Sequence, residues 1–559
     1  MQKKSFILLS AASALLLTTS CSKLGALSAD NFNVVPNPLE TEVGQVPATI
    51  NGTFPEKYMK KKAVVTVMPE LRYADGQVAK GQSATFQGEK VLGNDQSISY
   101  QLGGRYTMKT NFDYLNCNKA DMYLTFDARI GKKQVEVPAV KVAEGVIATS
   151  ELYKNTLKTA QAAISPDAFQ RINAQKQEAS IKFLIQQAQL RKSELKNNSV
   201  QEFVRLLQQI SNDREGLNLK EVEVSAYASP DGGFKLNDKL ANQRQQATEK
   251  YVQEQLKKTN NLNAPVDAKY TAQDWEGFQE LVKASNIQDK DVIIRVLSMY
   301  KDPEEREQQI KNISSAFREL ADGILPQLRR ARMIINYETI GRDDQQIQQQ
   351  LKADPTQLSV EELLYAATLV ESVNAKEDIY KTTTEVYPND ARAYNNIATL
   401  EYAKGNLDAA KKYIEQAQKL NGSLPEAYAN LGMIALRQGD LSAAENYISK
   451  ATGANGLAEV LGNLHLAQGK YAQAEQDFEN VYSNSAALAQ ILNKDYASAA
   501  VTLKYVKDTD ATTDYLKAIL GARMGNTSEA AQALKAAVAK DASLAGYAAN
   551  DIELLKVEK

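Results

Sequence analysis

Hydrophobic and polar residues alternate with a period near two in the first part of the chain. The segments AVVTVM (63–68), SISYQL (97–102), DMYLTF (121–126) and QVEVPAV (134–140) therefore predict β-strands. Clusters rich in Gly and Asn separate them. Short strands at this spacing predict an antiparallel β-sandwich over residues 30–150. The segment carries no recognisable set of reactive side chains, so its role is either a folded spacer or a partner-binding module.

Strand and helix patterns alternate over residues 178–340. Strands are predicted at 181–186, 221–228, 266–272 and 331–338. Amphipathic helices are predicted at 194–210 and after residue 233, and a helical insertion is predicted at 274–322. Strands interleaved with amphipathic helices predict an α/β two-layer domain.

A helical pattern repeats in the last part of the chain. Tyr394 and Tyr428 lie 34 residues apart, as do Gly405 and Gly439. This period, with small residues at fixed places, resembles the tetratricopeptide repeat, in which each copy is a helical hairpin. The array is predicted over 358–545, followed by a tail or cap at 546–559. Such stacks usually offer a concave surface to a protein partner, although a purely structural array is the alternative.

The chain begins with a pattern typical of a signal peptide. Lys3 and Lys4 precede an apolar run that ends at Leu17, and small residues then lead to Cys21. This arrangement resembles a bacterial lipoprotein signal, which implies cleavage after residue 20, lipidation of Cys21 and a short tether at 21–29. An ordinary secretory peptide that happens to precede a cysteine is the alternative. We expect Cys117, which would then have no partner for a disulfide, to be a small buried residue.

The composition narrows the function classes. The chain of 559 residues has 66 basic and 68 acidic side chains, so no charge excess points to nucleic acid. The chain has one histidine, His465, and two cysteines, which are too few ligands for the usual zinc site. A catalytic triad that uses histidine would have to include His465. His465 falls in a predicted repeat helix, where a packing or surface role is expected. We therefore predict no enzyme activity, no metal and no cofactor.

The stretch SAYASPDGGFKLNDKLANQRQQA (225–247) is the strongest candidate for a site. A strand enters a tight turn, and a helix leaves it. On that helix Arg244 shares one stripe with Leu240 and Ala247. A charged residue among apolar ones either pairs with a carboxylate inside the fold or binds an anion from outside.

The same stretch resembles the OmpA-like peptidoglycan-binding family, which includes the peptidoglycan-associated lipoproteins. The resemblance rests on Gly232, Asn237, Leu240, Ala241 and Arg244, which match the family turn and its Asn-x-x-Leu-(Ser/Ala)-x-x-Arg helix. It implies that Arg244 binds a carboxylate of the diaminopimelate in the peptidoglycan stem peptide, while an acid in the turn binds the ammonium group. A planar guanidinium and a helix N-terminus are chemically suited to that carboxylate.

The sequence departs from the family at the position of the turn acid, which is Ser229 here. Either Asp231 takes over the ammonium contact or that contact is lost, and Arg244 could instead close a buried ion pair with Asp231 or another acid. Asn237 and Ser229 would shape the turn. Arg330, in the Arg-rich entry to the last strand, would lie nearby.

The expected protein is a lipid-anchored outer-membrane protein that faces the periplasm, binds peptidoglycan and recruits a protein through its repeats. Two alternative functions are a scaffold subunit of an envelope assembly or secretion complex that does not bind peptidoglycan, and an envelope hydrolase.

Overall fold

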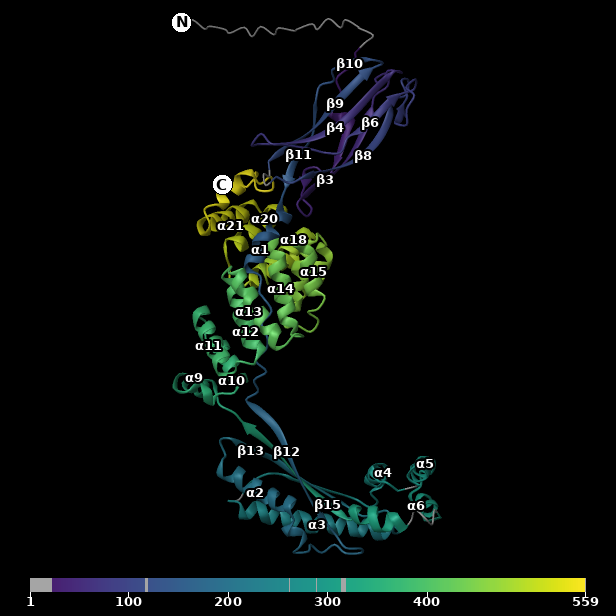
Figure 1. Ribbon diagram of the computed structural model, residues 1–559, viewed down its shortest axis with the longest axis vertical. Helices are drawn as coiled ribbons and strands as arrows, with labels where there is room; N and C mark the ends of the chain where they lie inside the picture. Colours follow the sequence, from purple (N-terminus) through teal and green to yellow (C-terminus); the bar gives the residue numbers. More distant parts are fainter. Residues whose placement is uncertain (1–22, 116–118, 261, 288, 313–317, 558–559) are drawn as a thin grey trace, which may run out of the picture. The chain divides into compact units, whose positions relative to one another are not determined.

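The computed structural model describes residues 23–115, 119–260, 262–287, 289–312 and 318–557. They form two compact units, one made of the residues up to 167 together with 370–559, the other of 168–369. The signal sequence, Cys21 and Cys117 lie outside the described residues. The chain is therefore multidomain, with a strand-rich N-terminal part and an all-helical C-terminal part (Figure 1).

The strand-rich part packs two sheets around one hydrophobic core. Within the described residues, one sheet has the order β1-β3-β8, and the other has the order β2-β11-β9-β4-β6-β7, with β5 on β4 and β10 on β9. Buried side chains from both sheets, such as Ile50 and Met122, meet in the core. The strands are β1 (Phe32–Val35), β2 (Leu39–Glu40), β3 (Gln45–Phe54), β4 (Ala63–Tyr73), β5 (Val78–Lys80), β6 (Ala84–Gly88), β7 (Gln96–Ile98), β8 (Gly104–Asp113), β9 (Ala120–Ile130), β10 (Lys133–Val135) and β11 (Val140–Ile147).

Two predicted strands are wrong in part. The strand predicted at 97–102 ends at Ile98, because the chain turns back at Gly103, which has a φ of +70°. The strand predicted at 134–140 is interrupted around Pro138, which has no N–H to donate to a ladder. Strands β3 and β8, which pair antiparallel along their whole lengths, were not predicted from the sequence.

The C-terminal part is a stack of helical hairpins. Gly405, Gly439, Gly469 and Gly525 join the two helices of successive hairpins in the left-handed conformation that glycine adopts at low cost. The helices are α11 (Val373–Val386), α12 (Ala391–Ala403), α13 (Leu407–Leu420), α14 (Pro425–Gln438), α15 (Leu441–Ile448), α16 (Leu457–Ala467), α17 (Tyr471–Asp477), α18 (Asn484–Leu492), α19 (Tyr496–Tyr505), α20 (Ala511–Arg523), α21 (Thr527–Lys540) and α22 (Leu544–Asn550).

Residues 149–167 belong to the same unit as the repeats. They form a 3-10 turn η2 (Thr149–Leu152), a short helix α1 (Tyr153–Thr159) and an extended stretch from Ala160 to Asp167. Helix α1 packs against α14, α16 and α18, which are first helices of successive hairpins (Figure 1). The first-helix face of the array is therefore covered by a segment that lies more than 200 residues earlier in the chain.

The second unit is an α/β structure. Its sheet has the order β12-β15-β13-β14, in which only the β13–β14 pair is parallel. Helices α2 and α3 pack on the sheet through a shared core that includes Phe203 and Val252. The elements are β12 (Ile172–Lys182), η3 (Glu194–Lys196), α2 (Asn198–Asn212), β13 (Leu217–Tyr227), α3 (Phe234–Lys258), β14 (Val266–Thr271), α4 (Trp275–Ala284), α5 (Lys290–Met299), α6 (Pro303–Asn312), η4 (Leu320–Ile324), α8 (Leu325–Leu328), β15 (Arg330–Ile340), α9 (Asp344–Ala353), η5 (Pro355–Gln357), α10 (Val360–Ala366) and η6 (Ala367–Leu369).

The first strand of this unit lies earlier than predicted. A strand was expected at 181–186, but β12 ends at Lys182. Its partner β15 is matched along the full length, from Ile172 opposite Ile340 to Lys182 opposite Arg330. Residues 183–187 instead leave the sheet as a loop, and that loop covers Arg244.

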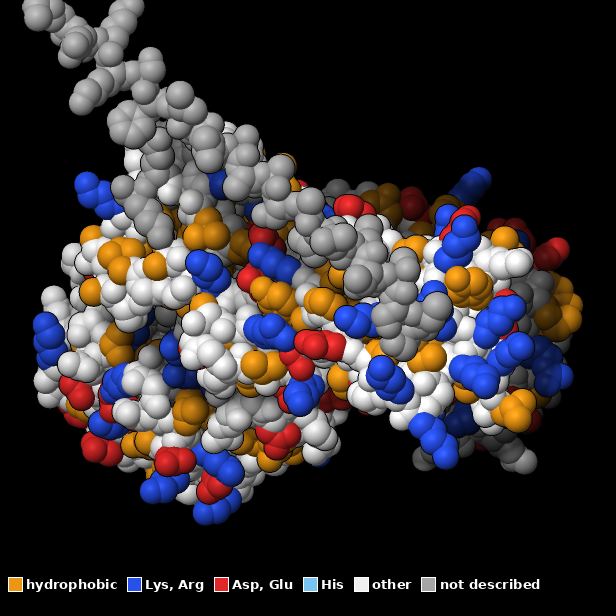
Figure 2. Space-filling view, turned by 90° about the horizontal axis from the view of Figure 1, so that it is seen from above, with side chains coloured by type: hydrophobic (Ala, Val, Ile, Leu, Met, Phe, Trp, Pro, Cys, Tyr) orange, Lys and Arg blue, Asp and Glu red, His pale blue; other side chains and the backbone are white. Residues whose placement is uncertain are grey.

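The surface is mixed in charge. The face in Figure 2 carries both basic and acidic side chains, with hydrophobic side chains scattered between them. In the described part of the chain, no helix is both long and apolar enough to cross a membrane.

Candidate functional site

The turn between β13 and α3 is fixed from within by Asn237. This buried side chain donates from Nδ2 to the carbonyl oxygens of Ser229 (2.9 Å) and Gly232 (2.8 Å). Gln273 donates to the same Gly232 oxygen at 3.1 Å. Leu240 is buried one helical turn further along α3. Asn237 and Leu240 are thus structural residues of the turn and its helix.

Arg244 is covered by its own chain. Only 1% of the residue is exposed. Its guanidinium donates to the backbone oxygens of Gln187 from Nε (3.0 Å), Tyr227 from Nη1 (2.9 Å) and Leu184 from Nη2 (3.3 Å). The guanidinium carbon also lies 5.1 Å from the ring centre of Phe183. Burial is the main cause that lowers the pKa of Arg244 to about 10, and the positive charge of Arg329 contributes in the same direction. The negative charge of Asp231 acts in the opposite direction.

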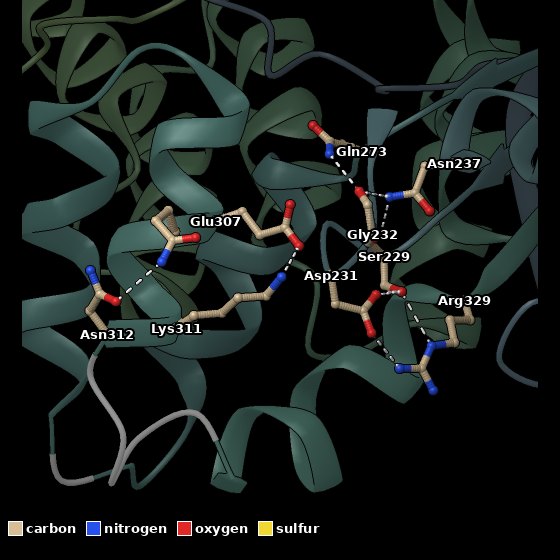
Figure 3. A network of polar contacts seen from close by, with 10 residues as sticks. Ser229, Asp231, Gly232, Asn237, Gln273, Glu307, Lys311, Asn312 and Arg329 are labelled. Atoms are coloured by element: carbon tan, nitrogen blue, oxygen red, sulfur yellow. Dashed lines mark hydrogen bonds and ion pairs between the residues drawn. The ribbon is translucent and has the colours of Figure 1, made fainter. Parts of the chain in front are cut away.

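Asp231 pairs with Arg329, a residue that the sequence analysis did not select. Nη2 of Arg329 lies 2.9 Å from Oδ2 of Asp231, and Nε of Arg329 donates to Oγ of Ser229 at 3.2 Å (Figure 3). The Ser229 hydroxyl in turn donates to the other carboxylate oxygen of Asp231. The three side chains form a closed network in which each charge of the turn already has a partner.

These contacts decide one of the alternatives left open by the sequence. The hypothesis that Arg244 itself closes an ion pair with Asp231 or another acid is wrong, since its hydrogen bonds in the described structure go to backbone carbonyls. Arg329 forms the ion pair with Asp231 instead.

Arg330 lies in a neighbouring pair. Its Nη2 is 3.1 Å from Oδ2 of Asp274, and its guanidinium lies over the ring of Tyr227 at 5.2 Å. Asp274 also caps α4 by accepting from the backbone N–H of Gly277 at 2.9 Å. Burial raises the pKa of Asp274, while Gly277 and Arg330 counteract that rise. The structure therefore brings Ser229, Asp231 and Asn237 together and places Arg330 with the insertion.

The helical insertion builds a cavity against the turn. The cavity has a volume of about 20 Å³, which is enough for a water molecule. Asp231 on one side faces Glu307 on the other, and Glu307 pairs with Lys311 (Figure 3). The remaining lining is mostly apolar: Pro230, Trp275, Phe278, Ile310, Leu320 and Leu325. The insertion thus reshapes the surroundings of the turn into a small apolar cavity with two carboxylates.

The arrangement limits what the site can bind. A zwitterionic ligand needs an accessible anion and an accessible cation. Arg244 is inaccessible, and both oxygens of Asp231 are engaged, so a ligand ammonium would have to displace Arg329 from Asp231.

The one sequence signal for Arg329 was the run LRRAR, in which adjacent arginines cannot be told apart before the start of β15 is known.

His465 lies in α16 and contacts the carboxylate of Asp477 in α17. No group of three or more His, Cys, Asp or Glu side chains in the described residues is arranged to hold a metal ion.

Residues 395–458 match the tetratricopeptide repeat family. Among solved structures, a tetratricopeptide repeat protein from Parabacteroides merdae is 14% identical with a TM-score of 0.27, and the alignment covers 38% of this chain and 91% of that chain. Pseudomonas aeruginosa pilF is 16% identical with a TM-score of 0.24, with 38% and 93% covered. Yeast Tom70 is 11% identical with a TM-score of 0.25, with 65% and 83% covered. A search of curated proteins finds no match. The C-terminal helical part therefore carries tetratricopeptide repeats, which generally bind protein partners.

Proposed function

We propose that the protein is a non-enzymatic adaptor of a Gram-negative cell envelope that recruits a protein partner through its repeat array. The observation that carries this proposal is the continuous stack of hairpins from α12 to α21, part of which matches the tetratricopeptide repeat family. A stack of this kind offers a large and regular surface whose main known use is protein recognition.

The place of action follows from the start of the sequence. A basic segment, an apolar run and Cys21 resemble a lipoprotein signal, so the mature chain would be held on the outer membrane by acyl chains and face the periplasm. Metabolic labelling with a radioactive fatty acid tests this part, and Cys21→Ala is the variant that must lose the label.

Peptidoglycan binding is the second candidate function. The OmpA-like motif around residues 229–244 favours it, as does the position of Asp231 on the wall of the cavity. The burial of Arg244 opposes it, because the family's carboxylate contact would need an accessible guanidinium. Peptidoglycan binding by this chain would therefore depend on the Asp231 carboxylate, once its ion pair with Arg329 has been broken.

Co-sedimentation of the lipid-free chain with purified peptidoglycan tests the second candidate. Wild type should pellet, Asp231→Asn should stay in solution, and Arg329→Gln should pellet more strongly because it frees the Asp231 carboxylate. Arg330→Gln is the matched control, since Arg330 pairs with Asp274. If wild type stays in solution, the second unit is a scaffold element without a wall ligand.

Site-specific photo-crosslinking in cells tests the adaptor role. Tyr482, Tyr505 and Met524 are about half exposed on the array and accept a photoreactive residue without core damage. They should crosslink to one envelope protein. A probe at Leu92, a fully exposed residue in the strand-rich part, is the control. Crosslinks from Leu92 to the same protein, or none from the array, would contradict recruitment by the repeats.

A further inference from the structure

Two asparagines of the repeat array each form hydrogen bonds with both the backbone N–H and the carbonyl oxygen of one residue in the segment 160–167. Asn430 accepts from the N–H of Ala163 (2.7 Å) and donates to its carbonyl oxygen (2.9 Å). Asn396 does the same with Ser165, at 2.8 Å and 3.0 Å. Asn396 and Asn430 are 34 residues apart, so they occupy the same place in successive repeats.

The pattern continues in both directions along the segment. The N–H of Gln161 donates to the carboxylate of Glu459 in the next first helix, α16. At the other end, Arg392 donates to the carbonyl oxygen of Asp167 at 3.0 Å. Three successive first helices, α16, α14 and α12, therefore contact alternate residues of an extended chain from 161 to 167, and α12 contacts both Ser165 and Asp167. Alternate residues of a strand point their backbone groups the same way, so side chains on one face of the array can bind each of them.

The contacts select small side chains at alternate positions, and one of them, from Nδ2 of Asn395 to Oγ of Ser165 at 3.1 Å, reaches a side chain. Asn455 also donates to the carbonyl oxygen of Ile164 at 3.0 Å. Ala163 and Ser165 are both 1% exposed, whereas the neighbouring Ile164 is 43% exposed. Gln161 and Pro166 are also exposed. The groove therefore recognises a peptide backbone in the extended conformation with small residues two positions apart.

The segment is anchored unevenly. Leu152 and Leu157, in η2 and α1, are part of the hydrophobic cores of the array, and Tyr402 donates to the carbonyl oxygen of Leu157 at 2.9 Å. From Ala160 onward the large side chain of Ile164 is exposed, and only the small side chains of Ala160 and Ala163 belong to the hydrophobic core of the array. The backbone of this stretch is held by hydrogen bonds to Asn395, Asn396 and Asn430. Release of residues 160–167 would uncover these amides and the contacts of two alanine side chains, whereas release of Leu157 would open the core. Exchange of residues 160–167 with another strand therefore costs less than release of α1.

We propose that the groove along the first helices α12, α14 and α16 is a binding site for an extended peptide, and that residues 160–167 of the same chain occupy it. When these residues dissociate, the groove binds a partner segment that has small residues at alternate positions. The inference rests on the proposed recruitment of a protein by the repeats and specifies how the groove takes part. The tethered segment competes at an effective concentration in the millimolar range, so it suppresses weak partners and admits only those that outcompete it.

A peptide-binding experiment on the full lipid-free chain tests the proposal. The probe is a fluorescent, capped peptide with the sequence of residues 160–167, AQAAISPD, and its anisotropy reports binding. Wild type should not bind it, because the cis segment fills the groove. Ala163→Glu should expel the cis segment and bind the peptide. Ile164→Glu, one position further at an exposed site, is the matched control and should behave as wild type.

A second variant locates the bound peptide. Adding Asn430→Ala to Ala163→Glu should weaken peptide binding about tenfold, since it removes one bidentate backbone contact. The proposal is overturned if folded Ala163→Glu does not bind the peptide, or if wild type or Ile164→Glu binds it as well as Ala163→Glu does. Neither result affects the crosslinking test of partner recruitment, so the two failures are distinguishable.

Hydrogen exchange decides the matter if Ala163→Glu does not fold. In Asn430→Ala the amides of residues 160–167 should exchange about tenfold faster than in wild type, with protection of α12, α14 and α16 unchanged. Loss of protection in these helices together with the segment would mean that the segment is an integral part of the repeat core, and the proposal would fall.

Discussion

Arg244 donates a 2.9 Å hydrogen bond from Nη1 to the carbonyl oxygen of Tyr227, the last residue of β13. The same guanidinium binds two carbonyl oxygens of the 183–187 loop, so one side chain ties the end of a strand to the loop that leaves β12. The residue that most resembles a ligand contact in the sequence is thus a buried structural clamp.

Replacement of Arg244 by Ala should destabilise the second unit by about 3 kcal/mol, because it leaves buried carbonyl oxygens without donors and creates a cavity. Urea unfolding followed by the fluorescence of Trp275, the only tryptophan of the chain, measures this unit selectively. Arg332→Ala is the control, since Arg332 makes a partly exposed ion pair with Glu178 and should cost less than about 1 kcal/mol. Equal effects of the two variants would refute the structural role of Arg244.

The stability of the repeat array should depend on the ionisation of Glu459. Burial raises the pKa of this carboxyl to about 7, against the hydrogen bonds from Ser483, Asn463 and Gln161. Between pH 4.5 and 7 the unfolded chain releases this proton and the folded chain keeps it, so stability falls as pH rises through this range and levels off above it. The full effect is about 3 kcal/mol.

Glu459→Gln mimics the protonated acid and should remove that part of the pH dependence. Urea unfolding followed by far-ultraviolet circular dichroism at a series of pH values compares the variant with wild type. Glu445→Gln, at an exposed site on α15, is the control and should retain the wild-type slope. A wild-type slope in Glu459→Gln would show that another group, such as the buried Asp551 whose pKa burial raises to about 6, dominates.

The close packing within the third hairpin gives another prediction. A Cβ on Gly462 would lie 2.6 Å from ring atoms of Phe478, and both residues are buried between α16 and α17. Gly462→Ala should therefore destabilise the array by about 2 kcal/mol despite the better helix propensity of alanine. Gly546→Ala in α22, where a Cβ would meet no atom within 4 Å, is the matched control and should be neutral or slightly stabilising. A thermal melt of each variant distinguishes the two outcomes.

Local patterns in the sequence predicted the repeats well, since Gly405 and Gly439 mark turns in which the backbone takes the left-handed conformation that glycine adopts at low cost. The period-3.6 stripe also placed Arg244 correctly among buried residues of α3. Both features depend on neighbours within one or two helical turns.

Features that depend on distant partners were not predictable in this way. The docking of Ala163 against Asn430 joins residues 267 positions apart, and the sequence AQAAISPD has no periodicity of its own. The choice of Arg329 over Arg330 as the partner of Asp231 depends on where β15 begins, and helix and strand boundaries are the least certain part of a sequence pattern.

Lys494 takes the place of the inter-helix glycine in the fourth hairpin. It joins α18 to α19 with a φ of +68°, close to the +80° of Gly439 between α14 and α15. A side chain in this conformation is strained by about 1 kcal/mol, whereas glycine adopts it freely. Lys494→Gly should therefore stabilise the array by about 0.5–1 kcal/mol, and Gly439→Ala should destabilise it by about 1 kcal/mol. Opposite shifts of the urea midpoint at constant slope would support this reasoning, because the two substitutions make inverse changes at equivalent turns. A destabilised Lys494→Gly would instead mean that the lysine side chain makes contacts worth more than the backbone strain.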